Sequence, residues 1–438
     1  MTKIPHLRWW IAGMLFLASV LNYLDRQTLS ILAPTIQKEL ALTDQDYALV
    51  VNLFLVAYTA ATLLSGRVVD RLGVRVSLAL FVGWWSVANL LTGFARSIVS
   101  LGAFRFLLGL GEAGNWTAAP KAVADWFPAK ERGIAIGLYT LGATIGATLA
   151  PILIVNIASR HGWQMAFVVT GVTGLVWLGP WLWLYRRPSE HPRLSDQERA
   201  HLGLPSLEHV GGVPPPRSIT TSLRGEDSPS SKSAADEKPE GWRTVLSRHE
   251  VWVLMLTRLL TDPVWYFYQF WFAKYLYGER SVSQLGLSIT FVIFLAADFG
   301  ALGGGWFSGL LIKRQVPPPA SRVRIMAAAA CVMPLSVLVP GVASLPVVLA
   351  IGMLVVFAHL TWLINLSSLV VDVIPQRSLA TTFGVIAAGS ALGGMVMNWA
   401  VGRLLTHASY GPAFFVMAGL HPLALLLVWR LRKLPAAM

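Results

Sequence analysis

The 438-residue sequence is too apolar for a soluble protein, because 55% of its residues are hydrophobic and only 13% are charged, about half the usual charged fraction. The formal net charge of +13 would suit a nucleic-acid-binding protein, but the placement of the basic residues excludes that class. A single cysteine, Cys331, excludes an internal disulfide and any multi-cysteine metal site.

Twelve apolar runs have the length of transmembrane helices, which need about 18 or more residues. Their approximate bounds are 8–32, 47–66, 76–95, 98–125, 133–157, 164–185, 250–277, 285–312, 323–341, 346–371, 380–405 and 411–430. The first run contains charged residues and lacks a cleavage site of small residues, so a retained helix is expected rather than a signal peptide. The sequence therefore predicts an all-α membrane protein with twelve transmembrane helices.

The basic residues follow a membrane topology. With the N-terminus inside, only five of the 35 Lys and Arg residues lie in or next to the outer loops: Lys38, Arg96, Arg160, Lys274 and Arg280. The excess on the inner side remains when the long central loop is left out. The positive-inside rule then places both termini in the cytoplasm. The net charge thus reflects topology, and no nucleic-acid partner is expected.

Residues 186–249 interrupt the apolar pattern. This segment is rich in Ser, Pro, Lys and Glu and carries too little apolar surface to fold, so a largely disordered cytoplasmic linker is expected. Within it, Ser195 and Glu198 have the spacing of a capping box for one short helix. The linker would separate a six-helix bundle over 1–185 from a second one over 250–438.

The two halves echo each other in sequence. DWFP at Asp125–Pro128 and DVIP at Asp372–Pro375 are offset by 247 residues. At the same offset, glycines of the first half meet glycines of the second: Gly137, Gly142 and Gly146 with Gly384, Gly389 and Gly393. Parallel repeats of this kind are a known plan of membrane transporters. We therefore expect two pseudo-symmetric bundles of six helices.

The fourth run, RFLLGLGEAGNW, places two charges inside the membrane, where each costs at least roughly 2.5–3.5 kcal/mol. Arg105 and Glu112 share a helix face but are about 10 Å apart along the axis, too far for a tight ion pair. Asp25 and Arg26 of the first run supply the opposite charges, so spans one and four should pair around a central cavity. A carboxylate that loses its arginine to an anion can then take up a proton. The alternative is a purely structural clamp.

The seventh run offers a second candidate site. Arg258 either pairs with Asp262 one turn away or binds a substrate carboxylate in a two-pronged fashion, and we favour the second. After Pro263 the aromatic stretch VWYFYQFW contains residues such as Tyr266 that can stack on or hydrogen-bond to a sugar.

The segment GRVVDRLGVR, from Gly66 to Arg75, joins spans two and three. Gly66 and Gly73 permit a tight turn. Asp70, Arg71 and Arg75 can pair with helix ends, and such a charged latch can stabilise one closed state of a gate. The corresponding stretch of the second half, GWFSGLLIKR, lacks the aspartate.

Several stretches resemble a known family. GRVVDRLGVR resembles the loop signature of the major facilitator superfamily. NYLDRQTLS, RFLLGLGEAGNW, TDPVWYFYQFWFAKYL and AHLTWLINLSSLVVD are similar to its anion:cation symporter branch, in particular to bacterial hexuronate (glucuronate and galacturonate) transporters. The resemblance covers all twelve spans and leaves out the central loop. It implies proton-coupled import of a sugar acid by alternating access across a bacterial inner (plasma) membrane, by a monomer without cofactor or metal ion.

The resemblance also implies residue roles. The residues implied in proton coupling are Asp25, Arg26, Arg105 and Glu112. The residues implied in substrate binding are Arg26, Tyr58, Arg105, Asn115, Thr144, Arg258, Tyr266, His359, Trp362 and Asn365. His359 also lies 247 residues after Glu112, the mirror position in the second half.

Two departures from the family pattern leave the substrate open. Relatives often carry Asn at the position of Thr144 and Phe at that of Trp116. An aldonate, aldarate, dicarboxylate or monocarboxylate is therefore the close alternative to a hexuronate. A drug/proton antiporter would need a cavity dominated by acids, and a membrane-embedded enzyme would need a nucleophile–base set or metal cluster that does not stand out.

Overall fold

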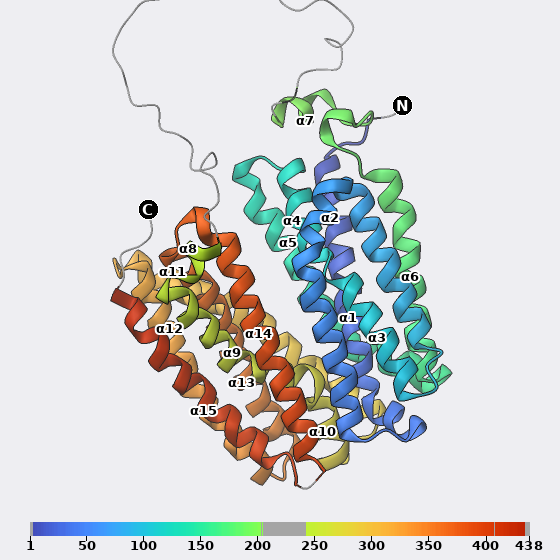
Figure 1. Ribbon diagram of the computed structural model, residues 1–438, viewed down its shortest axis with the longest axis vertical. Coiled ribbons are helices and arrows are strands. Elements are labelled where there is room, and N and C mark those ends of the chain that lie inside the picture. Colours follow the sequence, from blue (N-terminus) through green and yellow to red (C-terminus); the bar gives the residue numbers. More distant parts are fainter. Residues whose placement is uncertain (1–2, 203, 205–241, 407, 434–438) are drawn as a thin grey trace, which may run out of the picture.

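The computed structural model describes residues 3–202, 204, 242–406 and 408–433, and these are almost entirely helical (Figure 1). The helices of the first half are α1 (Leu7–Leu40), α2 (Asp44–Thr92), α3 (Ile98–Glu112), α4 (Asn115–Trp126), α5 (Ala129–His161) and α6 (Trp163–Leu184). Short helices η1 (Pro188–Glu190), α7 (Asp196–His201) and α8 (Trp242–Leu246) follow. The second half contains α9 (His249–Phe270), α10 (Phe272–Glu279), η3 (Leu285–Thr290), α11 (Phe291–Lys313), α12 (Pro318–Val332), η4 (Met333–Gly341), α13 (Leu345–Val373), α14 (Gln376–Leu404), α15 (Gly411–Val428) and η5 (Trp429–Lys433).

The predicted all-α membrane fold is confirmed. Within the described residues, nine helical segments are long and apolar enough to cross a membrane. The remaining helices are consistent with twelve spans: the first part of α2, the α3–α4 pair and the α9–α10 pair. α3 and α4 are each too short because the helix is interrupted after Glu112, and α9 carries Arg258 and Asp262. The charged and interrupted spans are therefore those that carry most of the candidate site.

The internal repeat is visible in the helix bounds. Four boundaries of the first half recur 247 residues later: the starts of α2, α3 and α5 match those of α11, α13 and α14, and the end of α4 matches that of α13. One difference stands out. α13 runs without a break where the first half is divided between Glu112 and Asn115.

Glycines let the fifth helix of each half approach the first. A Cβ on Gly142 or Gly146 of α5 would lie 2.4 Å from the carbonyl oxygen of Phe16 or Val20 of α1. In the second half, Gly389 and Gly393 of α14 meet the carbonyls of Met255 and Leu259 of α9 in the same way. Small residues are needed at such close helix crossings. By these contacts, residues of α1 are equivalent in the repeat to residues of α9 that lie 239 positions later in the sequence.

The two halves are joined at one end (Figure 1). The hydrogen bonds and ion pairs recorded between them lie at the end opposite α7, where Ser30 Oγ donates to the carbonyl of Gln269 (2.5 Å) and Tyr47 to that of Phe270 (2.7 Å). Lys274 of α10 pairs with Asp44 at the start of α2, and Thr148 of α5 donates to Asp298 of α11 (3.2 Å). Toward α7 the ribbons of the two halves diverge.

The segment that follows α6 is hydrogen-bonded to the start of α1. Ser195 caps α7 by accepting a hydrogen bond from the backbone N–H of Glu198 (3.2 Å), as the capping box requires. The second hydrogen bond of a capping box, from the backbone N–H of Ser195 to the Glu198 carboxylate, was predicted wrongly. That carboxylate instead accepts from the backbone N–H of Leu7 (2.9 Å) and from Arg8 (2.9 Å). Residues 205–241 of the predicted linker lie outside the described residues.

The segment Gly66–Arg75 departs in part from the prediction. The turn lies at Gly73, whose φ of 73° and ψ of 162° leave the helical region, whereas Gly66 is helical. Arg75 donates to the carbonyl of Leu182 at the end of α6, as expected of a helix-end contact. Arg71 is exposed, and the side chain of Asp70 lies outside the described part of the chain.

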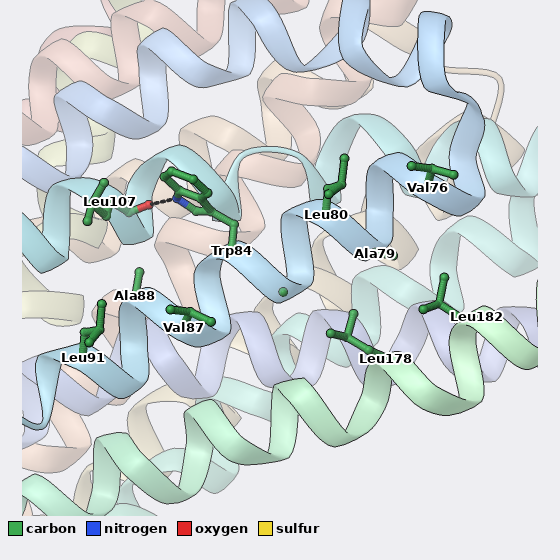
Figure 2. A pocket seen from close by; sticks show the side chains of 11 residues that line it. Val76, Ala79, Leu80, Trp84, Val87, Ala88, Leu91, Leu107, Leu178 and Leu182 are labelled. Carbon is green, nitrogen blue, oxygen red and sulfur yellow. Dashed lines mark hydrogen bonds between the residues drawn. The ribbon is translucent and has the colours of Figure 1, made fainter.

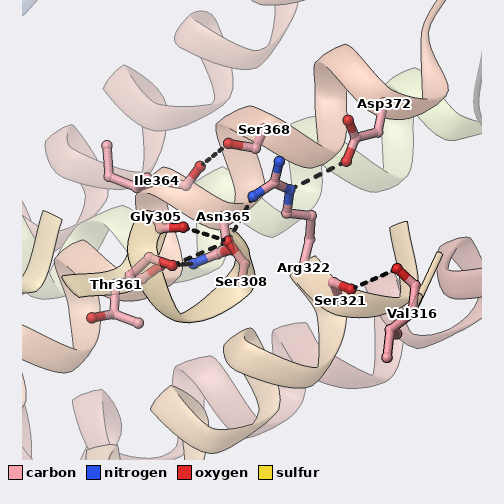
Figure 3. Close-up of polar contacts among 11 residues, drawn as sticks. Gly305, Ser308, Val316, Ser321, Arg322, Thr361, Ile364, Asn365, Ser368 and Asp372 are labelled. Atoms are coloured by element: carbon pink, nitrogen blue, oxygen red, sulfur yellow. Dashed lines mark hydrogen bonds and ion pairs between the residues drawn. The ribbon is translucent and has the colours of Figure 1, made fainter. Parts of the chain in front are cut away.

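The second half has its own polar network at the matching place (Figure 3). Arg322 of α12, 247 residues after Arg75, donates to Ser308 (2.6 Å) and to Asp372 at the end of α13 (3.3 Å). In the first half, Asp125 accepts instead from the hydroxyl of Tyr185 (3.3 Å). The repeat thus preserves the charges at this end but not their partners.

The α1–α5 crossing predicts that Gly146→Ala destabilises the protein, because the added Cβ would overlap the Val20 carbonyl oxygen. Overpacking of this kind costs about 1–3 kcal/mol. Gly137→Ala on the same helix is the matched control, since a Cβ there meets nothing within 4 Å. The midpoint of thermal unfolding in detergent should fall for Gly146→Ala and stay or rise for Gly137→Ala; equal midpoints would contradict the crossing.

Candidate functional site

An ion pair between α1 and the end of α3 forms the centre of the first half. Both Nε (3.0 Å) and Nη2 (2.8 Å) of Arg26 donate to Oε2 of Glu112. Glu112 is fully buried, and its Oε1 has no hydrogen-bond partner among the described residues. This is the pairing of spans one and four that the seven-residue spacing predicted. It satisfies the charge of Glu112 while leaving one acceptor oxygen free.

Aromatic rings surround the guanidinium of Arg26. Its Cζ lies 5.1 Å from the ring centre of Tyr23, 5.2 Å from that of Phe54 and 4.8 Å from that of Tyr58. Desolvated cation–π contacts of this type contribute up to about 2 kcal/mol each. The Arg26 side chain is 12% exposed. The three aromatic contacts would therefore still hold the Arg26 guanidinium if its ion pair with Glu112 broke.

Arg105 does not pair with the carboxylate of Asp25, the opposite charge that span one offers it. Oδ1 of Asp25 accepts from Asn89 (2.6 Å), which also donates to Thr170 (2.7 Å). Arg105 donates to the backbone carbonyl of Asp25 (3.4 Å) and lies over the ring of Phe167 (5.1 Å). The reason is helical geometry: consecutive residues point about 100° apart, so Asp25 faces α2 and α6 while Arg26 faces α3.

Arg105 therefore has side-chain N–H donors that can still bind an acceptor. Its Nε and Nη2 are buried and have no hydrogen-bond partner within the described residues. Together with Arg26 it lines a cavity of about 10 Å³ between the halves, which Leu29, Val51, Phe54 and Phe270 also line. In this conformation the cavity has room for about one water, and the two guanidinium groups make its surroundings positive.

The second half contributes a charged pair within α9. Nε of Arg258 donates to Oδ2 of Asp262 (2.7 Å), and the Ser390 hydroxyl donates to the same oxygen. This is the intrahelical pair that we disfavoured from sequence. The Arg258 side chain is still 20% exposed. Tyr266, one turn further, stacks on the ring of Phe270 (6.0 Å between ring centres).

His359 occupies the place of Glu112 in the repeat but makes different contacts. Its ring lies parallel to that of Trp265 (6.2 Å between centres, 4° between planes). Trp265 in turn lies 239 residues after Arg26, so an aromatic stack replaces the ion pair of the first half. Nδ1 of His359 is 3.1 Å from Nε2 of His421 on α15, and both rings are fully buried. His359 is thus held by His421 rather than exposed between the halves.

The other predicted binding residues serve helix packing in this conformation. Asn365 donates to the carbonyls of Gly304 and Thr361 (2.9 Å each), and Asn115 donates to Ser19 (3.2 Å). Trp362 packs against the ring of His421. The hydroxyl of Thr144 donates to the carbonyl of Leu141 (2.9 Å).

Several residues of the site were not predicted. They share a role as direct partners of predicted residues: Tyr23, Phe54, Asn89, Phe167, Thr170, Ser390 and His421. Two carry a signal that was available in the sequence. Asn89 in WWSVANLLTG and His421 in AGLHPLALLL are polar residues within apolar runs. The aromatic partners carry no such signal, because aromatic residues are common throughout these spans.

The chain belongs to the Major Facilitator Superfamily, whose family model matches residues 15–397, and this family and the relatives below make it a membrane transporter rather than an enzyme. Among curated proteins it is 30% identical to the hexuronate transporter of Escherichia coli (strain K12), over 98% of this chain and 95% of that protein. It is 31% identical to the galacturonate transporter of Dickeya chrysanthemi, over 72% of this chain and 85% of that protein.

Solved structures agree on the fold. The inward-open xylose transporter XylE from E. coli superposes with a TM-score of 0.69 at 15% identity, covering 97% of this chain and 96% of that one. A bacterial homologue of the human lysosomal transporter Spinster, in an inward-facing and unoccupied conformation, gives a TM-score of 0.67 at 20% identity, covering 98% and 95%. At these identities the likeness shows the fold alone.

The His359–His421 contact predicts that His421→Leu destabilises the second half. Nδ1 of His359 would then be buried without a partner, which costs about 1–3 kcal/mol. His421→Asn should lose less, because its side-chain amide can either donate to that nitrogen or accept from it. His161→Leu, at the exposed end of α5, serves as the control. The check is the midpoint of thermal unfolding in detergent, and an unchanged midpoint for His421→Leu would contradict the contact.

Proposed function

We propose that this transporter imports a hexuronate or a related sugar acid together with protons, by alternating access. The observation that carries the proposal is the caged Arg26–Glu112 pair. A cation held by three aromatic rings can exchange one carboxylate for another without moving far. The similarity to hexuronate and galacturonate transporters supports a sugar acid as the incoming anion.

The coupling follows from competition for Arg26. A substrate carboxylate that binds the guanidinium in two-pronged fashion takes the two donors that Glu112 now uses. Glu112 is fully buried, so it would be left as a charge without a cation, and protonation is the cheapest way to remove that charge. One anion and one proton then load together. Arg105 provides a second positive group on the same cavity.

Alternating access is supported by where the halves touch. In the proposed topology, with both termini in the cytoplasm, the recorded contacts at Ser30, Tyr47 and Lys274 seal the outer end. The halves diverge toward α7 on the cytoplasmic side (Figure 1). Opening outward would require these outer contacts to break. The proposed setting is the inner membrane of a bacterium, and the proposed unit is a monomer of two six-helix bundles, 1–185 and 250–438, joined by 186–249.

In this proposal the sugar part of the substrate would meet Tyr58, beside Arg26 in the first half, and Arg258 and Tyr266 of α9 in the second. Another small carboxylate is the second candidate, because the arginines recognise the carboxylate and not the sugar. The similarity to the D-galactonate transporter of E. coli O6:H1, 29% identical over 93% of this chain and 91% of that protein, favours an aldonate among these alternatives.

The test is uptake into liposomes that contain the purified protein. Labelled galacturonate, glucuronate, galactonate and lactate are supplied with and without an inward proton gradient. We expect the gradient to drive accumulation of at least one of the sugar acids and not of lactate. Arg26→Gln should abolish uptake, whereas Arg160→Gln, at an exposed helix end, should leave it unchanged. Absence of gradient-stimulated uptake of any of the four anions would refute the proposal.

A further inference from the structure

An apolar groove on the outer face of the first half lies away from the charged site (Figure 2). It has a volume of about 640 Å³ and lies between the second part of α2, α3 and α6. Leu178 and Leu182 of α6 line it together with Val76, Leu80 and Trp84 of α2. Leu80 and Trp84 are 54% and 51% exposed. The groove therefore opens toward the hydrocarbon of the membrane.

The length of the groove matches a lipid chain. Its lining residues on α2 run from Val76 to Leu91, which at 1.5 Å per residue is about 22 Å. One leaflet contributes about half of the ~30 Å hydrocarbon core. The groove is thus longer than the ~15 Å depth of one leaflet, so an acyl chain of one leaflet can lie in it and fill most of its length.

A basic cavity lies at the end of this groove. Its volume is about 400 Å³, and Arg75, Lys121, Arg186 and Arg187 line it together with two acids, Asp125 and Glu190. The remaining lining residues are Leu72, Gly73, Val74 and Tyr185. Basic side chains outnumber acidic ones by two to one, so the cavity attracts anions.

The two cavities meet at the membrane surface. Arg75 of the basic cavity precedes Val76 of the groove and donates to the carbonyl of Leu182, another groove residue. Gly73 marks the turn between two spans, and Tyr185 follows the last residue of α6. Arg187 Nη2 would be 3.8 Å from a Cβ at Gly73, so the turn and the end of α6 lie side by side. Positive charge therefore stands at headgroup depth and apolar surface directly below it.

We propose that groove and basic cavity together bind one anionic phospholipid. Its phosphate would contact Arg75, Arg186 and Arg187, and one acyl chain would lie along Leu80 and Trp84. Basic pockets between transmembrane helices are known to hold anionic headgroups. A lipid with a choline headgroup would bring a cation into an already positive cavity. A soluble phosphate would use the basic cavity but not the groove.

The bound lipid would link parts of the fold that are separate in sequence. Its headgroup would bridge the turn at Gly73 and the segment after α6, while its chain would fill the space between α2 and α6. The lipid should therefore stabilise the first half against thermal unfolding.

The test is native mass spectrometry of the full-length protein titrated with phosphatidylglycerol or phosphatidylcholine of identical chains. We expect tighter binding of phosphatidylglycerol, weakened roughly tenfold or more in Arg186→Gln/Arg187→Gln. Lys313→Gln/Arg314→Gln is the matched control, because it removes two exposed basic residues at the end of α11 in the second half. Ala79→Phe, which fills the groove, should weaken phosphatidylglycerol but not glycerol phosphate.

Three results would overturn the proposal. Equal binding of the two lipids would show that no anionic site exists. Equal weakening by the control pair would show diffuse attraction to the whole surface. Glycerol phosphate binding as tightly as phosphatidylglycerol, with no effect of Ala79→Phe on the lipid, would show a site for a soluble anion instead.

Discussion

The ion pair between Arg26 and Glu112 is the constraint on which the rest of the site depends. A buried carboxylate needs a cation because an uncompensated charge in a low-dielectric interior costs several kcal/mol. Arg26 of α1 supplies that cation to Glu112 at the end of α3. Tyr23, Phe54 and Tyr58 then keep the guanidinium at the same place. In the proposed mechanism the Arg26 guanidinium can therefore exchange Glu112 for a substrate carboxylate while its own position stays the same.

The internal repeat places an aromatic stack in the second half where the first half has the Arg26–Glu112 ion pair. Helix boundaries and glycine crossings recur between the halves, so the scaffold is shared. The residues at equivalent places differ: Arg26 and Glu112 correspond to Trp265 and His359. A stack of neutral rings needs no counter-ion. The first half therefore holds the ion pair at this place, while the charged pair of the second half, Arg258 with Asp262, lies elsewhere on α9.

The helices, the repeat and the pairing of Glu112 with Arg26 could be predicted from the sequence. They follow from the length of the apolar runs, from the 247-residue offset between the halves and from the seven-residue spacing of Arg105 and Glu112. Sequence reasoning did not identify the partners of Asp25 and Arg105. Those depend on the rotation of α1 about its axis, which places Asn89 and Thr170 beside Asp25. It also preferred a free Arg258, although Asp262 lies one turn away. His421 was missed because a lone histidine near a chain end carries no spacing to another residue. The spacing of residues along one helix shows which of them share a face of that helix. It does not show which side chains of a neighbouring helix they contact.

The central claim is that Glu112 carries the proton, and Glu112→Gln tests it most directly. Glutamine can still accept from Arg26 and cannot titrate, so the fold and the binding of substrate should persist. The measurement compares two modes of the same liposomes with labelled galacturonate: accumulation driven by a proton gradient, and exchange of internal for external substrate without a gradient. We expect Glu112→Gln to abolish accumulation and to retain exchange. Gradient-driven accumulation that survives unchanged would contradict the claim.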